Sequence, residues 1–186
     1  SIDPGGSLSA GTNKDVAEDF LKVLDSSIDE SDFINWSTAT FNRVAASLPF
    51  YPVEGVLDTV LELKARGIKI GLSTADTVEN GTLFLKKTGL LEHFDYIGAD
   101  DGIVNPKPAT DYMEIFCSRF GLRPEEVAVV GDTMADMHFA SNSGAGLIIG
   151  VLSGTGTAEL LSGHADIILD SVNDICRTGR LVWEEL

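Results

Sequence analysis

The sequence predicts an α/β fold, a Rossmann-like parallel sheet with helices on both faces, preceded by helices that have no strand between them. Two observations support this prediction. Short apolar runs alternate with amphipathic helical stretches from about residue 51 onward. The runs are apolar throughout, as is typical of parallel strands covered on both faces. We divide the chain into a flexible tail at 1–12, a helical segment at 13–49 and an α/β core at 50–186.

The N-terminal part reads as a tail followed by two helices. Its first dozen residues are rich in Ser, Gly and Pro, which favour turns and irregular backbone. From Lys14 onward, apolar residues recur on one helical face: Val16, Phe20, Val23 and Leu24. A second amphipathic stretch covers about 31–48, and Asp29 or Ser31 can cap it.

The core begins with a helix and then repeats one pattern. Apolar residues at helical spacing start at Val56, and Gly67 ends this helix before a strand at 68–73. The pattern continues with helices over residues 78–87, 110–120, 134–143 and 158–161, and with strands at 96–97, 127–131, 146–150 and 165–169.

The charge of the chain excludes several classes of partner. The 186 residues carry 13 Lys and Arg against 29 Asp and Glu, a net charge of −16. Nucleic-acid binding draws its affinity from Lys and Arg that neutralise phosphates, so we expect no nucleic-acid partner and no anionic membrane surface. We find no signal peptide and no apolar run long enough to span a membrane, and we expect a cytoplasmic protein. The oligomeric state cannot be read.

Cysteines and histidines give no metal-site pattern. Cys117 and Cys176 lack CxxC spacing and read as ordinary semi-buried thiols. His93, His138 and His164 share no ligand spacing and read as surface or packing residues.

Two acids follow the strand at 127–131. Asp132 comes directly after this strand, and Asp136 lies four residues later at the start of a helix. Ligands bind at the carboxyl ends of the strands in open α/β sheets. Two carboxylates at such a turn can share Mg²⁺, although one acid can instead cap the helix.

Two further strand-end and loop features point to an anion. Thr74 and Ala75 follow the strand at 68–73, where a hydroxyl and backbone N–H groups can donate to a phosphoryl oxygen, although helix capping also explains a Thr there. Lys107 lies between two prolines, which hold its backbone extended and stiff. Such placement suits a lysine that meets an anion at a fixed position.

Together, Thr74, Lys107 and the pair Asp132 and Asp136 resemble the second, third and fourth motifs of the haloacid dehalogenase-like hydrolases, in order and spacing. The resemblance covers about residues 50–176 and is greatest to the phosphoglycolate phosphatase-like and phosphonatase-like branch. It implies a phosphatase of small phosphorylated metabolites that acts through an aspartyl-phosphate intermediate.

The resemblance also implies a role for each motif residue. Thr74 and Ala75 would bind a phosphoryl oxygen, and Lys107 would neutralise charge shared by the nucleophile and the phosphate. Asp132 would bind Mg²⁺, and Asp136 would support the metal.

The family's first motif, an apolar strand ending in DxDGT, has no counterpart in the sequence. Only Asp3 to Leu8 can be laid over it, with Gly5 at the second Asp, and we do not assign Asp3 as the nucleophile. In the family this strand lies between those that end at Thr74 and Asp132, so its loss would leave two edges unpaired. We expect a truncated chain in which residues 13–49 are the remnant of a helical cap.

Two other functions stay open. One is a catalytically inactive relative that binds phosphate or a protein partner. The other is a phosphonatase, which would need a cap lysine, for which Lys14 and Lys22 are the early candidates. We interpret Asp100 and Asp101 either as supporting residues of the site or as turn formers. Trp36 either lines a pocket of the cap or is a packing residue. The glycines from Gly154 to Gly156 lack the spacing of a dinucleotide-binding loop.

Overall fold

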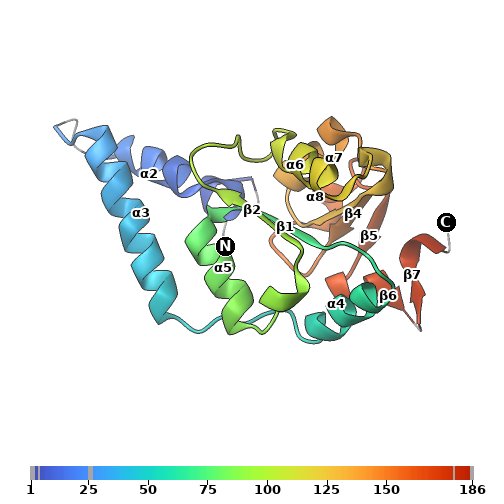
Figure 1. Ribbon diagram of the computed structural model, residues 1–186. Coiled ribbons are helices and arrows are strands. Elements are labelled where there is room, and N and C mark those ends of the chain that lie inside the picture. The colour runs from blue at the N-terminus through green and yellow to red at the C-terminus, as the bar shows by residue number, and fades with distance from the viewer. Residues whose placement is uncertain (1–2, 4, 25–26, 178, 185–186) are drawn as a thin grey trace.

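The structure is a computed structural model that describes residue 3 and residues 5–24, 27–177 and 179–184. Its N-terminal part is helical: α1 covers Ser7–Ala10, α2 covers Asn13–Leu21 and α3 covers Glu30–Ser47. Figure 1 shows α2 and α3 beside the α/β part, with α3 next to α5.

The two long N-terminal helices agree with the sequence prediction, and their caps explain where they begin. Thr12 and Asp15 form a capping box at the start of α2. Of the two candidate caps for α3, Asp29 is used, because its side chain accepts a hydrogen bond from the backbone N–H of Asp32. The short helix α1 lies where the sequence predicts a tail, and the Ser9 hydroxyl, which donates to the carbonyls of Asp3 and Gly6, closes this turn.

Strands and helices alternate from α4 to β5, as predicted. The elements are α4 Val56–Ala65, β1 Gly71–Thr77, α5 Val78–Lys87, β2 Tyr96–Asp100, α6 Asp111–Phe120, β3 Ala128–Gly131, α7 Met134–Ser143, β4 Leu147–Val151, α8 Ala158–Leu161 and β5 Ile167–Leu169. Two short strands follow, β6 Cys176–Arg177 and β7 Arg180–Leu181. The 3₁₀ helices are η1 Leu91–His93, η2 Pro124–Glu126, η3 Val172–Ile175 and η4 Val182–Glu184.

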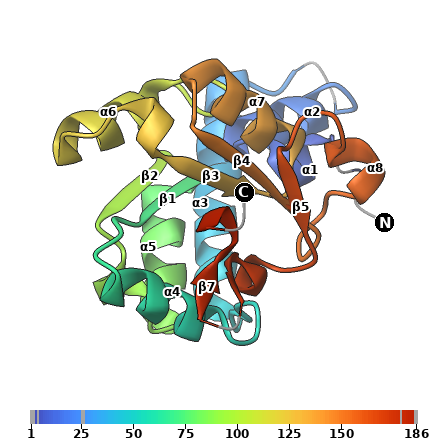
Figure 2. The same ribbon diagram turned by 90° about the vertical axis from the view of Figure 1, so that its right-hand side faces the viewer.

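The parallel strands form two sheets. β1 pairs with β2, with Leu72 opposite Ile97, and the second sheet has the order β3-β4-β5, with Val130 opposite Ile149. No described strand pairs with the other edge of β1 or of β3. Figure 2 shows the two sheets next to each other, with β1 and β3 on the facing sides. The parallel sheet is therefore divided between β1 and β3, at the two edges that are expected from the sequence to be unpaired without the first motif's strand.

Helices cover both faces of the β1–β2 sheet, as predicted. On one face, Leu72 packs with Val60 of α4 and Leu85 of α5. On the other face α6 lies close to the strands, because a Cβ on Gly98 would be 2.9 Å from the Tyr112 ring. A second core cluster joins α6 to α7, and a third lies around β4 and β5.

Two predictions from composition can be compared with the structure. Cys117 is buried, Cys176 is half-buried, and both are free thiols. Over the residues that the structure describes, no helix has both the length and the apolar character needed to cross a bilayer.

Candidate active site between the ends of β1 and β3

A cavity of about 600 Å³ lies between the carboxyl ends of β1 and β3. All five residues predicted for the site line it: Thr74, Ala75, Lys107, Asp132 and Asp136. The fold brings them together from three places, because β1 and β3 end at the same side and the loop before α6 brings in the lysine. Residues of α1, α2 and α3 line another side of the cavity.

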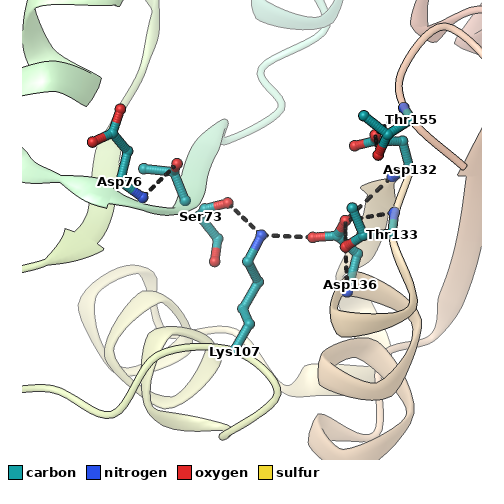
Figure 3. A network of polar contacts seen from close by, with 8 residues as sticks. Ser73, Asp76, Lys107, Asp132, Thr133, Asp136 and Thr155 are labelled. Carbon is teal, nitrogen blue, oxygen red and sulfur yellow. Dashed lines mark hydrogen bonds and ion pairs between the residues drawn. The ribbon is translucent and has the colours of Figure 1, made fainter. Parts of the chain in front are cut away.

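Lys107 connects the two strand ends. Its Nζ forms an ion pair with Asp136 Oδ1 at 2.6 Å and donates a hydrogen bond to the Ser73 carbonyl at 2.9 Å (Figure 3). Both charged side chains are nearly closed to solvent, with exposed fractions of 12% for Lys107 and 10% for Asp136. An ion pair shielded in this way is screened little by salt, so it holds the ammonium group firmly at the cavity wall.

The second carboxylate oxygen of Asp136, Oδ2, holds the turn at the start of α7. Asp136 Oδ2 accepts hydrogen bonds from the Thr133 hydroxyl at 2.7 Å and the Thr133 N–H at 3.0 Å. The Asp132 N–H also donates to it, at 3.2 Å. With Thr133 as the N-cap, this is a capping box at the start of α7. A Cβ on Gly131 would collide with the Asp136 side chain, so the tight turn needs glycine there.

Asp132 is held through one carboxylate oxygen. Asp132 Oδ2 accepts hydrogen bonds from the N–H of Thr155 at 2.7 Å and from its hydroxyl at 3.1 Å (Figure 3). A Cβ on Gly154 or Gly156 would collide with Asp132, so these glycines let the loop after β4 approach. Asp132 Oδ1 has no hydrogen-bond partner in the described part of the chain. One oxygen is therefore fixed while the other is available to a ligand.

The end of β1 is held by a polar network that reaches α3. The Thr74 hydroxyl accepts a hydrogen bond from the Asp76 N–H at 3.1 Å, which leaves its own proton able to donate. Asp76 Oδ1 accepts from the Thr77 N–H at 2.7 Å and from Asn80 Nδ2 at 2.8 Å. Asn80 Nδ2 also donates to Asn42 of α3, at 2.9 Å. The helical segment is thus tied directly to β1, the strand in which Thr74 lies.

The residues present can hold Mg²⁺ in a limited way. The described chain has no cluster of three or more His, Cys, Asp or Glu side chains that could bind a metal. Both oxygens of Asp136 are already engaged, and Asp132 offers one free oxygen. Mg²⁺ is usually held by one or two carboxylates together with waters and substrate phosphate. Asp132 fits this pattern as a single carboxylate ligand.

Other candidates from the sequence lie outside the cavity. Lys14 and Lys22 form ion pairs with Glu18 and Asp19 on α2, and neither lines the cavity. Asp100 and Asp101 accept backbone N–H bonds within their own turn.

Three further predictions concern the surface and the tail. Trp36 is exposed and packs near Phe33, and the rings of His138 and His164 meet edge to face. The Asp3 side chain accepts a hydrogen bond from the Gly5 N–H. Pro4, which follows Asp3 in the segment compared with the family's first motif, lies outside the described residues.

Sequence reasoning missed the residues that hold the predicted ones in place. Thr133 could have been found, because a Thr three residues before an Asp at the start of a helix is typical of a capping box. Thr155 and Asn80 have no such local pattern. Thr155 lies 23 positions from Asp132, and Asn80 meets Asn42 only through the packing of α3 on α5.

Comparisons with known proteins find one family. A family model described as "Haloacid dehalogenase-like hydrolase" matches residues 12–149. Pyrophosphatase PpaX of Bacillus pumilus (strain SAFR-032) is 30% identical over 136 residues, which is 73% of this chain and 63% of that protein. A phosphoglycolate phosphatase of Salmonella typhi is 29% identical over 64% of this chain and 48% of its own length. This chain thus spans less than two thirds of either relative.

Solved structures show the same fold. The crystal structure of CbbY from Rhodobacter sphaeroides in complex with phosphate superposes with a TM-score of 0.75 at 22% identity, covering 90% of this chain and 76% of that one. A β-phosphoglucomutase from Clostridium difficile gives a TM-score of 0.72 at 21% identity, covering 90% and 74%.

Proposed function

The chain belongs to the haloacid dehalogenase-like hydrolase family, and from this membership we propose that it is a Mg²⁺-dependent phosphatase of small phosphorylated metabolites. The similarity to PpaX and to phosphoglycolate phosphatase supports the phosphoglycolate phosphatase-like branch. We also propose that the enzyme is cytoplasmic. Its net charge of −16 argues against a nucleic-acid partner.

The observation that carries the proposal is the convergence of a hydroxyl, an ammonium group and a partly free carboxylate on one cavity. The Thr74 hydroxyl and the backbone of Ala75 would bind phosphoryl oxygens. Lys107, held by Asp136 and the Ser73 carbonyl, would offset phosphate charge without having to reorganise during the reaction. The substrate is therefore expected to be a small molecule with a terminal phosphate.

Asp132 is our candidate ligand for the metal, and Asp136 supports the turn that positions it. Mg²⁺ bound there would supply positive charge to the phosphate oxygens. Other residues of the chain would position these groups. Thr155 fixes one oxygen of Asp132, and Asp136 holds Lys107 and the backbone at 132–133.

A generic aryl phosphate tests this proposal. We expect Mg²⁺-dependent release of the aryl alcohol, lost with EDTA and at least about 100-fold slower in Lys107→Ala and in Asp132→Asn, each of which removes charge stabilisation from the phosphate. Lys14→Ala, an exposed lysine outside the cavity, is the matched control and should keep its rate. Hydrolysis that survives both cavity variants would contradict the proposal.

A second function is favoured by one observation. Each described carboxylate that lines the cavity already has hydrogen bonds that fix it: Asp76, Asp132 and Asp136. None of them is assigned as the nucleophile that an aspartyl-phosphate route needs, in which a carboxylate oxygen bonds to phosphorus as the alcohol leaves. The alternative is a catalytically inactive member of the family that binds phosphate. Phosphate affinity lost in Lys107→Ala, together with no turnover of any phosphate ester, would establish it.

A further inference from the structure

Asn42 of α3 forms three hydrogen bonds to the start of α5. Its Oδ1 accepts from the Thr77 hydroxyl at 3.1 Å and from Asn80 Nδ2 at 2.9 Å. Its Nδ2 donates to Glu79 Oε2 at 3.0 Å. An amide oxygen can accept two hydrogen bonds, so both acceptor sites of Asn42 are used at this contact. Asn42 does not line the cavity, so any effect that it has on a ligand there is indirect.

Asn80 connects Asn42 to β1. Asn80 Nδ2 carries two protons, and it donates to Asp76 Oδ1 at 2.8 Å as well as to Asn42. Asn80 is buried, with an exposed fraction of 5%, and buried polar groups are nearly always hydrogen-bonded. If Asn42 were removed, the Asn80 amide would have to turn to satisfy its free proton. The position of the Asp76 carboxylate therefore depends on Asn42.

The strand ladder does not hold the segment that contains Asp76. β1 pairs with β2 from Gly71 to Ser73 and again at Thr77, after a shift in register. Between these pairs, the Asp76 N–H donates to the Thr74 hydroxyl at 3.1 Å. Thr74 Oγ1 accepts this bond and keeps its own proton for another acceptor. The direction of the Thr74 hydroxyl is thus set by side-chain hydrogen bonds around Asp76.

A second contact keeps α3 on α5 without Asn42. Lys87, in the last turn of α5, donates through Nζ to the Ala46 carbonyl at 2.8 Å and lies 5.0 Å from the centre of the Phe50 ring. Figure 1 shows α3 and α5 next to each other. A change at Asn42 would therefore leave the helix in place and act mainly on the segment around Thr74.

We propose that Asn42 is a positioning residue for phosphate binding, which acts through Asn80 and Asp76 to keep the Thr74 hydroxyl directed at a phosphoryl oxygen. This inference rests on the proposed function, in which Thr74 donates to the phosphate. A hydroxyl that is already directed does not have to be ordered when the ligand binds, and this raises the affinity. Removing the Asn42 amide should weaken phosphate binding although no group that touches phosphate is lost.

Calorimetric titration of the 186-residue protein with inorganic phosphate, in the presence of Mg²⁺, tests this role. We expect binding to be about 5- to 10-fold weaker in Asn42→Leu, which keeps the size of the side chain and removes its acceptors. Asn35→Leu is the matched control and should bind as the parent does, because Asn35 is exposed on the same helix and does not line the cavity. A parent chain that binds no phosphate would refute the proposed function. Equal binding by the parent and Asn42→Leu would refute the positioning role alone.

Amide hydrogen exchange gives a second readout that does not depend on phosphate. In the free protein, NMR should show faster exchange of the Asp76 N–H in Asn42→Leu than in the parent. Asn42→Asp should restore slow exchange, because a carboxylate oxygen accepts from Asn80 and Thr77 as the amide oxygen does. The bond to Glu79, which this variant loses, is exposed and can be replaced by water. Exchange that is equal in all three proteins, or as fast in Asn42→Asp as in Asn42→Leu, would overturn the proposal.

Discussion

Lys107 and Asp136 form an ion pair whose two members are almost closed to solvent and whose remaining hydrogen-bonding groups are largely satisfied by the protein. Removing one member of such a pair leaves a buried charge without compensation, which costs far more than losing a surface ion pair. Lys107, which we propose offsets the charge of a bound phosphate, therefore also stabilises the fold through its pair with Asp136.

We predict that Lys107→Ala lowers the free energy of unfolding by about 3 kcal/mol, because Asp136 stays buried without its cation. Urea denaturation measures this. Asp136→Asn combined with Lys107→Met removes both charges and should recover most of the loss. A double variant as unstable as Lys107→Ala would show that the cost arises from packing and not from the unpaired charge.

Gly154 lets the loop after β4 lie close against Asp132. Because a Cβ there would meet the carboxylate, we predict that Gly154→Ala displaces the loop and breaks the Thr155 hydrogen bonds. The variant should lose about 1–3 kcal/mol of stability. It should also bind Mn²⁺, used as a probe of the proposed Mg²⁺ site at Asp132, more weakly than the parent chain. Thr155→Val, which removes only the hydroxyl, should have a smaller effect on both urea unfolding and Mn²⁺ titration. A Gly154→Ala protein that matches the parent in both would contradict this role.

Sequence reasoning predicted the residues at strand ends and missed the contacts that hold them. Thr74, Lys107 and Asp132 could be predicted because each was expected at a strand end or in a stiff loop, where local pattern is informative. Thr74 in fact lies within β1, where the pairing with β2 shifts register. Thr155 and Asn42 act through contacts between elements that are far apart in the chain. Only the packing of the fold brings such residues together.

At the scale of elements, Asp95 connects α4 to the start of both strands of the first sheet. Its carboxylate forms an ion pair with Lys64 and accepts a hydrogen bond from the Ile70 N–H at 2.9 Å. Burial alone would raise the pKa of Asp95, but the hydrogen bonds from Lys64 and Ile70 and the charges of Lys64 and Lys69 outweigh it, so the pKa is lowered.

A lowered pKa in the folded state means that this stabilisation is complete above the usual pKa of an aspartate and is lost as the pH falls through the folded value. We predict that Asp95→Asn costs about 1–2 kcal/mol at neutral pH and that the difference from the parent chain shrinks in acid. Urea unfolding over a pH series measures it. A difference that stays constant in acid would rule out the ionic origin.

The same contact explains one difference between predicted and observed strands. The sequence predicts a strand at 68–73, yet β1 covers Gly71–Thr77. At its start the Ile70 N–H is used by the Asp95 side chain before the ladder begins, and at its end Thr77 pairs with Asp100 after a shift in register. Helices α5, α7 and α8 have the predicted bounds, since caps and apolar spacing mark both ends. The short strands β6 and β7 hold 2 residues each, too few for a period to be read.

For the whole molecule, the net charge of −16 is a source of repulsion that folding must overcome. We predict that raising NaCl from about 20 mM to about 300 mM increases the melting temperature by about 3–6 °C, because salt screens repulsion between exposed carboxylates. Near the isoelectric point of about 4.3 the same salt step should have little effect. A melting temperature that falls with salt at neutral pH would show that attractive ion pairs dominate.

The division of the sheet between β1 and β3 also bears on how the chain melts. No ladder of backbone hydrogen bonds crosses that place in the described structure, and the strand ends are joined there through the Lys107 side chain. The β1–β2 sheet and the β3–β4–β5 sheet are thus joined by side chains, through the core clusters that link α6 to α7 and Leu63 of α4 to β4 and β5, and not by a backbone ladder. Cooperativity should be reduced, so that the calorimetric enthalpy exceeds the van't Hoff enthalpy, and more so in Lys107→Ala.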